Sequence, residues 1–140
     1  MSLVLKYQSL IESSSPMPTL LLQLSSIDGH RSTEVLAGVD TGFDGLLAIP
    51  FSIFNQIDLM SSRIPGDQSA YGETASGERV EFTSSYALMT VPNLLNEVQI
   101  EVDTFTGCSL PIVGRQLLGL FNTLLKGAEE EAEYTLNGLL

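Results

Sequence analysis

Short extended segments separated by turn residues constrain the fold of this chain more than any other feature. Residues 98–103 alternate apolar and polar side chains, which is the pattern of a strand with one buried face. Asp28-Gly29 separates two further segments and is typical of a hairpin turn. The other expected strands are 3–7, 19–24, 33–39 and the segment around Val80 and Phe82, with a closing strand within 134–140. These segments predict a mostly β chain that folds as one small barrel or sandwich.

Two segments have helical spacing instead. Apolar residues recur every three to four positions in 49–57, and Pro50 suits the start of a helix of about two turns. A longer helix is predicted over 117–125, with Lys126-Gly127 as its C-terminal stop. Residues 61–68 are expected to form a polar loop, and the acidic run 129–133 a solvated surface.

Composition narrows the possible functions. A length of 140 residues suits one domain with a core, and a formal net charge of −11 argues against nucleic acid and anionic membranes as partners. One cysteine, Cys108, and one histidine are too few for a disulfide or a His/Cys metal site. No apolar run of ~18 residues is present, so no membrane span is expected. The segment GDQSAYG lacks the ending of a phosphate-binding loop, so no cofactor is expected, and the single thiol favours a reducing cytoplasm.

The segment VDTGFDGLLAIP, residues 39–50, carries the candidate chemistry. An apolar strand leads directly into Asp40, Thr41 and Gly42, and an apolar run follows. Asp40 is either an ordinary turn acid facing water or a carboxylate that the fold holds in a dry site. A second Val-Asp-Thr, at 102–104, is interpreted as coincidence, because Asp103 is expected on the polar side of its strand and Phe105 replaces the glycine.

About seventy residues after the Asp-Thr-Gly comes PIVGRQLL, two β-branched residues followed by Gly, Arg and a predicted helix. With these two motifs the sequence resembles the retropepsin-like aspartic peptidases, and among them the single-domain bacterial and archaeal kind. The resemblance covers about residues 19–126 of a single 1–140 domain, and no correspondence is found for the acidic tail 127–140. It implies a mostly all-β acid-protease barrel with one helix in the C-terminal half and a flap hairpin.

Aspartic peptide hydrolysis needs one group that activates water and another that protonates the carbonyl oxygen. Two carboxylates about 3 Å apart share one proton and perform both tasks. This chain has one Asp-Thr-Gly and is too short for two lobes, so the resemblance implies a homodimer with Asp40 of each copy near a twofold axis. Thr41 would brace the two loops across that axis, and Gly42 would allow a tight turn beside the substrate, a peptide or protein.

The resemblance also implies supporting roles. The residues expected to pack behind the loop are Ile112, Val113, Gly114 and Arg115, with Arg115 paired to Asp44 in a partly buried contact. A hairpin that turns at TASG is the expected flap, closing over an extended peptide. The expected substrate-contacting residues are Asp44, Thr74, Ala75, Ser76 and Gly77.

Phe43 departs from the commoner family pattern, in which a small residue or a hydroxyl follows the glycine. Without that hydroxyl the dyad is expected to keep its shared proton to milder pH than in pepsin-like enzymes, and the bulk of the ring is expected to narrow the cleft.

Two other functions stay open. One is a non-catalytic protein that uses this fold to dimerise or to bind an extended peptide, and the other is an unrelated β-barrel binding module with Asp-Thr-Gly by accident.

Overall fold

A computed structural model describes residues 2–12, 14–65, 71–73 and 77–136. The helical elements are α1 (Phe51–Gln56), α2 (Arg115–Leu118) and the 3₁₀ turn η1 (Leu59–Ser62). The strands are β1 (Ser2–Lys6), β2 (Thr19–Ser25), β3 (Ser32–Val39), β4 (Leu47–Ala48), β5 (Tyr71–Glu73), β6 (Arg79–Glu81), β7 (Thr83–Val91), β8 (Leu95–Thr104), β9 (Ile112–Val113), β10 (Phe121–Lys126) and β11 (Glu131–Leu136).

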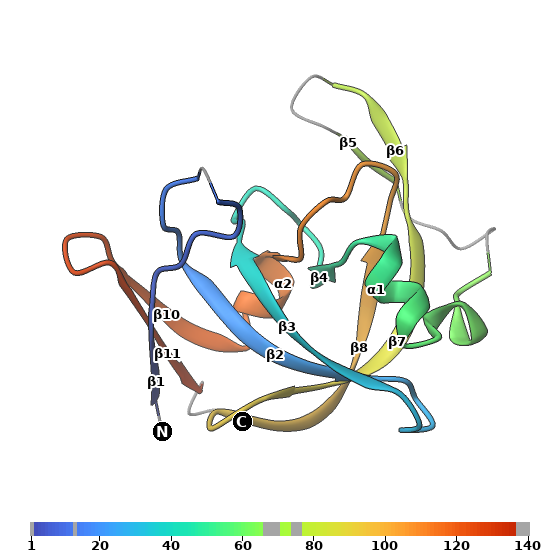
Figure 1. Ribbon diagram of the computed structural model, residues 1–140, viewed down its shortest axis with the longest axis horizontal. Helices are drawn as coiled ribbons and strands as arrows, with labels where there is room; N and C mark the ends of the chain where they lie inside the picture. Colours follow the sequence, from blue (N-terminus) through green and yellow to red (C-terminus); the bar gives the residue numbers. More distant parts are fainter. Residues whose placement is uncertain (1, 13, 66–70, 74–76, 137–140) are drawn as a thin grey trace.

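Six strands close into a barrel in the order β2-β3-β9-β4-β8-β7 (Figure 1). Most neighbours are antiparallel, but β3 pairs in parallel with β9, and β4 in parallel with β8. The alternation in β2 places Leu20, Leu22 and Leu24 inside, each fully buried, while Gln23 faces out. The prediction of a mostly β barrel is therefore confirmed.

The C-terminal part of the chain differs from the prediction. The helix expected over 117–125 is wrong, because α2 ends at Leu118 and Phe121 begins strand β10. Gly119 follows the single helical turn, and β10 then pairs along its whole length with β11. That pairing supplies the backbone hydrogen bonds that a longer helix would have made, so tertiary structure overrides the local spacing.

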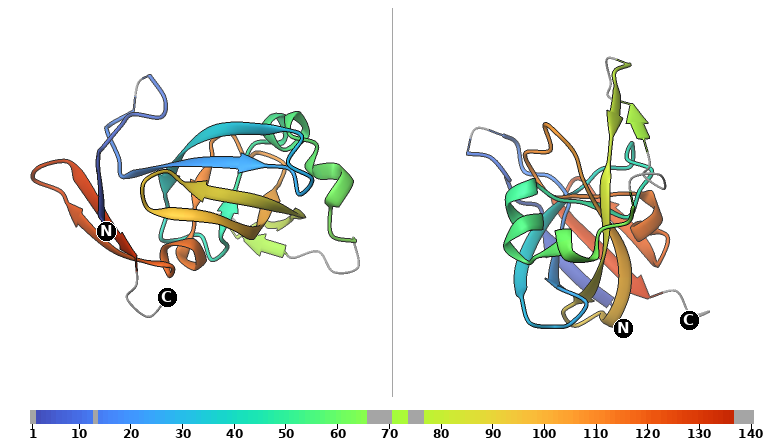
Figure 2. Two further views of the ribbon diagram at one scale, coloured as in Figure 1. Left: turned by 90° about the horizontal axis from the view of Figure 1, so that it is seen from below. Right: turned by 90° about the vertical axis from the view of Figure 1, so that its right-hand side faces the viewer.

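The terminal strands form a second sheet, β1-β11-β10, beside the barrel (Figure 2). Part of the acidic run lies in this sheet, since Glu131 and Glu133 belong to β11, whereas Glu129 and Glu130 are exposed as expected. Tyr134 of β11 is fully buried and donates a hydrogen bond of 2.7 Å to the Thr19 carbonyl oxygen at the start of β2. This bond joins the terminal sheet to the barrel.

The elements between β4 and β7 agree more closely with expectation. The predicted first helix is present as α1, and Pro50 directly precedes it with φ of −56°. Part of the expected loop 61–68 instead belongs to η1, and its last residues lie outside the described ranges. Within the described part of the chain, no helix is both long and apolar enough to span a membrane.

Candidate active site

Asp40 lies directly after β3, at the start of a loop formed by residues 40–46, here called the Asp40 loop. The Asp40 amide donates to the Val113 carbonyl oxygen at 2.9 Å, which fixes the loop to β9. The Gly42 amide donates to Asp40 Oδ1 at 2.9 Å, and a Cβ on Gly42 would lie 3.2 Å from the same oxygen. The carboxylate is thus oriented by its own loop, and in a single chain it is exposed to solvent, as are Thr41 and Gly42.

Strand β9 lies behind the Asp40 loop. Val113 pairs with Val39 on one side and with Leu47 on the other, so β9 joins the two strands that flank the loop. Val113 is fully buried and Ile112 partly buried. The position expected for this segment, packed behind the Asp40 loop, is the one the structure shows.

The residues after β9 donate backbone hydrogen bonds to the Asp40 loop. The amides of Gly114, Arg115 and Gln116 donate to the carbonyl oxygens of Leu46 (2.9 Å), Phe43 (2.9 Å) and Gly45 (3.2 Å) respectively. A Cβ on Gly114 would overlap the Gly45 carbonyl oxygen and lie 2.8 Å from that of Phe43. Only glycine permits this approach, which explains in structural terms the glycine that precedes α2.

The predicted contact between Arg115 and Asp44 is present as an ion pair. Its expected partial burial is wrong for a single chain, because the two side chains are 58% and 84% exposed. Both residues lie on the outer surface of the Asp40 loop and the start of α2, where water screens the pair.

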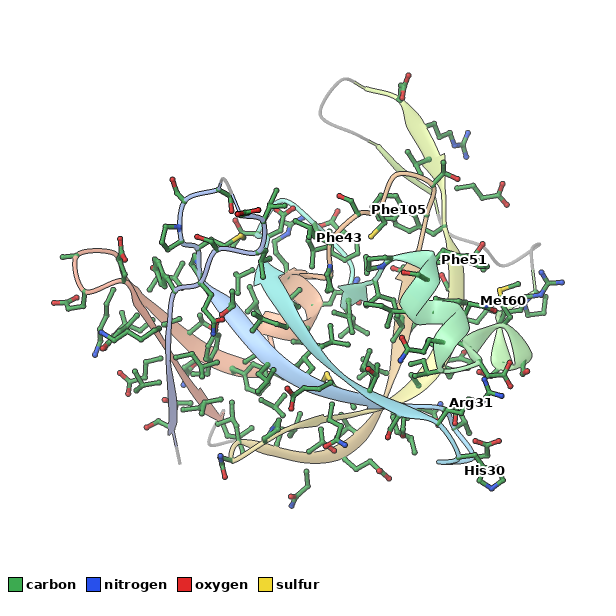
Figure 3. All side chains as sticks on the ribbon, in the orientation of Figure 1. His30, Arg31, Phe43, Phe51, Met60 and Phe105 are labelled. Carbon is green, nitrogen blue, oxygen red and sulfur yellow. The ribbon has the colours of Figure 1, made fainter. Side chains whose placement is uncertain are left out.

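The ring of Phe43 belongs to an aromatic cluster with Phe82 and Phe105. Figure 3 labels Phe43 and Phe105, which lie near one another at the end of the barrel where the Asp40 loop lies. Phe43 meets Phe82 edge-to-face at 6.2 Å between ring centroids, and Phe82 lies 5.2 Å from Phe105. Phe82 connects β6 to β7, so the cluster lies at the base of the β5–β6 hairpin. The Phe43 side chain is therefore held by packing between the Asp40 loop and that hairpin.

The candidate flap is the hairpin β5–β6, with Tyr71 opposite Glu81 and Glu73 opposite Arg79. Figure 1 and Figure 2 show it projecting beyond the barrel at the end where the Asp40 loop lies. Gly77 has φ of +85°, the positive value expected for the turn. Thr74, Ala75 and Ser76 lie outside the described residues.

One acidic residue near the site is more buried than the sequence indicates. Asp103 alternates with the buried Val102, as expected for the polar side of its strand, but it is only 8% exposed. The carboxylate is covered by Ser84 of β7, which bonds to it, and by Gly45 of the Asp40 loop, where an added Cβ would lie 3.1 Å from Oδ2. Burial raises its pKa above the ordinary 3.8, the repulsion from Glu101 adds to this, and a 2.6 Å hydrogen bond from Ser84 Oγ opposes it. The only sequence signal was the repeated Val-Asp-Thr.

The residues that the structure describes include no group of three His, Cys, Asp or Glu side chains that could hold a metal ion. The described site offers instead an oriented carboxylate, rigid backbone around it and a hairpin nearby. These are parts suited to acid–base chemistry on a bound chain.

No model of a known protein family matches the sequence. An uncharacterized protein of Archaeoglobus fulgidus is 31% identical over 103 residues, which is 73% of this chain and 77% of that protein.

Two solved structures share the architecture. A retropepsin-like aspartic protease from Rickettsia conorii matches with a TM-score of 0.56 at 9% identity, over 96% of this chain and 90% of that one. EIAV protease, in complex with the inhibitor HBY-793, matches with a TM-score of 0.52 at 16% identity, over 79% of this chain and 92% of that one. This chain therefore has the retropepsin-like fold and belongs to the same family as the Archaeoglobus fulgidus protein.

Proposed function

We propose that the protein is an aspartic endopeptidase that works as a homodimer, with Asp40 of both copies forming the catalytic dyad. The observation that carries the proposal is the Asp40 loop, whose carboxylate is oriented by the Gly42 amide and whose backbone is held by Gly114, Arg115 and Gln116. The two structural neighbours are themselves proteases by name, which supports the same class of reaction here.

The dimer follows from the chemistry. A single exposed carboxylate cannot act as base and acid at once, and the sequence holds one Asp-Thr-Gly. Across a twofold axis, two Asp40 side chains would share one proton. The ionised one takes a proton from water, whose oxygen attacks the peptide carbonyl carbon, and the protonated one gives its proton to the carbonyl oxygen. The tetrahedral intermediate then breaks at the C–N bond: the amine nitrogen receives the proton that the first Asp40 took from water, and one hydroxyl of the intermediate returns a proton to the second Asp40 as the carbonyl of the new carboxylic acid forms.

The remaining candidate residues take supporting roles in this proposal. Thr41 braces the paired loops across the twofold axis. Asp44 and the flap residues 74–77 bind an extended peptide. The Phe43 side chain provides no hydroxyl to the dyad, unlike the residue at this place in the commoner family pattern. The lone thiol, Cys108, suits a reducing compartment such as the cytoplasm.

The test compares Asp40→Asn with a matched control, Asp28→Asn. Asp28 is also an exposed turn acid whose carboxylate accepts a 2.9 Å bond from the amide two residues ahead, that of His30. With an unfolded protein and a mixed peptide library as substrates, the wild type and Asp28→Asn should cleave, and Asp40→Asn should not. Circular dichroism and sedimentation check that both variants keep the fold and the oligomeric state.

Two outcomes would overturn the proposal. Cleavage that persists in Asp40→Asn would assign the activity elsewhere. A wild-type dimer that cleaves nothing between pH ~3 and ~8 would instead support a non-catalytic dimerisation or peptide-binding role for the same fold.

A further inference from the structure

Asp103 is a buried carboxylate that the proposed reaction does not use. It lies near the end of β8 and is only 8% exposed, together with Ser84, which is 3% exposed. Ser84 Oγ donates to Asp103 Oδ1 at 2.6 Å, a short distance typical of a hydrogen bond to a charged acceptor. A buried acid of this kind is costly unless its hydrogen bonds serve the fold or the site.

The two oxygens of Asp103 face different parts of the candidate active site. Oδ1 contacts Ser84, near the start of β7, and β7 continues from the β5–β6 hairpin through Phe82. Oδ2 faces the Asp40 loop, since a Cβ placed on Gly45 would lie 3.1 Å from it. One carboxylate therefore accepts a hydrogen bond from the root of the candidate flap and lies beside Gly45 of the loop that carries Asp40.

The backbone at Asp103 strengthens this connection. Its carbonyl oxygen accepts from the Ile49 amide at 2.9 Å, just after β4, which is the strand that follows the Asp40 loop. Gly45 in turn accepts from Gln116 at the start of α2. Asp103 thus belongs to a continuous set of contacts that runs from β7 to the Asp40 loop.

From this geometry we infer that Asp103 is a positioning residue, which fixes the flap-bearing strand relative to the Asp40 loop through Ser84 and Gly45. The inference rests on the proposed peptidase function for its effect on rate. Asp103 does not touch the substrate. It keeps the hairpin and the catalytic carboxylate at a fixed separation, so that a peptide held by the flap meets Asp40 in the reactive geometry.

The kinetic test separates hydrogen bonding from packing. Asp103→Asn keeps the shape and an acceptor oxygen for Ser84, whereas Asp103→Leu keeps a similar volume with no acceptor. Ser84→Ala removes the donor with the smallest change in volume, and it serves if the leucine variant does not fold. Glu97→Gln, at an exposed position of the same strand, is the matched control.

We expect Ser84→Ala and Asp103→Leu to lower kcat roughly ten-fold or more, the rate equivalent of one lost hydrogen bond, with little change in KM. Asp103→Asn should retain most of the wild-type kcat, and Glu97→Gln all of it. Equal losses in Asp103→Asn and Asp103→Leu, or a wild-type kcat in Ser84→Ala, would overturn the inference.

Amide hydrogen exchange gives a second measurement that does not need peptidase activity. In Ser84→Ala, exchange at the amides of residues 42–46 and of 79–84 should quicken together, by about ten-fold, while the rest of the barrel stays protected. Faster exchange in only one of the two segments would contradict the coupling. If the wild type proves inactive, the proposed function fails, but this experiment still decides whether Asp103 links the two segments.

Discussion

Among the glycines in and beside the Asp40 loop, Gly114 leaves the least space for an added Cβ. An added methyl group would overlap the Gly45 carbonyl oxygen and lie 2.6 Å from the Phe43 ring. The first of these atoms belongs to the backbone and cannot move aside without displacing the loop. We therefore expect Gly114→Ala to lower the free energy of unfolding by about 3 kcal/mol, at the upper end of the usual cost of overpacking.

Urea denaturation measures this cost, and Gly127→Ala provides the control. Gly127 lies in the turn after β10 with nothing within 4 Å of an added Cβ. Its substitution should change the free energy of unfolding by no more than about 0.5 kcal/mol. Similar small effects at both positions would show that the Asp40 loop can shift to make room at Gly114.

The raised pKa of Asp103 predicts a pH dependence of stability. Because its folded pKa exceeds the ordinary 3.8, the folded chain holds this proton more tightly than the unfolded chain does. The contribution of this protonated carboxyl to the free energy of unfolding is fully present below pH 3.8 and is lost as pH rises through the folded pKa. Asp103→Asn cannot titrate, so wild-type stability relative to this variant should fall as pH rises through that window and stay constant above it.

Chemical denaturation of both proteins from pH ~3 to ~8 tests this expectation. The other carboxylates titrate in both proteins, so the difference between the two curves isolates Asp103. Parallel curves throughout would show that the buried carboxyl titrates normally.

The residues around Asp40 differ in how far the sequence predicts them. Asp40, Gly114 and Arg115 stand in short motifs, and their backbone contacts depend on residues close to those motifs. The Asp44–Arg115 pair could be inferred on the same basis, but its exposure could not. The burial of Asp103 depends on Ser84 of β7 and on Gly45 of the Asp40 loop, both distant in the sequence, so the alternation of 98–103 alone could not predict it.

At the scale of elements, α2 and β10 show why local spacing fails. Leu117, Phe121 and Leu124 recur at helical intervals, yet only Leu117 lies in a helix. A short apolar run with three- to four-residue spacing also fits a strand whose neighbours bury alternate residues. The deciding partner, β11, begins in the acidic segment that the sequence assigned to a solvated surface and continues into the expected closing strand, so its hairpin with β10 could not be recognised.

The hydroxyl of Tyr134 adds a buried hydrogen bond to the packing that joins the terminal sheet to the barrel. Tyr134→Phe removes the hydrogen bond to the Thr19 carbonyl oxygen and keeps the ring packed edge-to-face on Phe121. We expect a loss of about 1–2 kcal/mol in the free energy of unfolding, because a buried acceptor loses its donor.

Tyr86→Phe is the matched control, since Tyr86 is 44% exposed on β7 and water replaces any bond its hydroxyl makes. Its effect on thermal or urea unfolding should lie within about 0.5 kcal/mol. A neutral Tyr134→Phe would mean that packing alone joins the terminal sheet to the barrel.

At the scale of the whole molecule, charge opposes the proposed dimer. Each chain has a formal net charge of −11, so two chains repel one another as they approach. Salt screens this repulsion, since the Debye length falls from about 30 Å at 0.01 M to about 8 Å at 0.15 M. The exposed Asp44–Arg115 pair contributes at most about 1 kcal/mol, so its own loss to screening is the smaller effect.

We therefore expect added salt to strengthen dimerisation. Sedimentation equilibrium of Asp40→Asn, which avoids self-cleavage, should give a lower dimer Kd at 0.3 M than at 0.02 M NaCl. Glu97→Gln with Glu129→Gln, two exposed positions, should lower Kd at low salt and have little effect at high salt. A dimer weakened by salt would indicate an interface held mainly by ion pairs. A chain that stays monomeric at every salt and protein concentration would remove the second Asp40, and with it the peptidase mechanism.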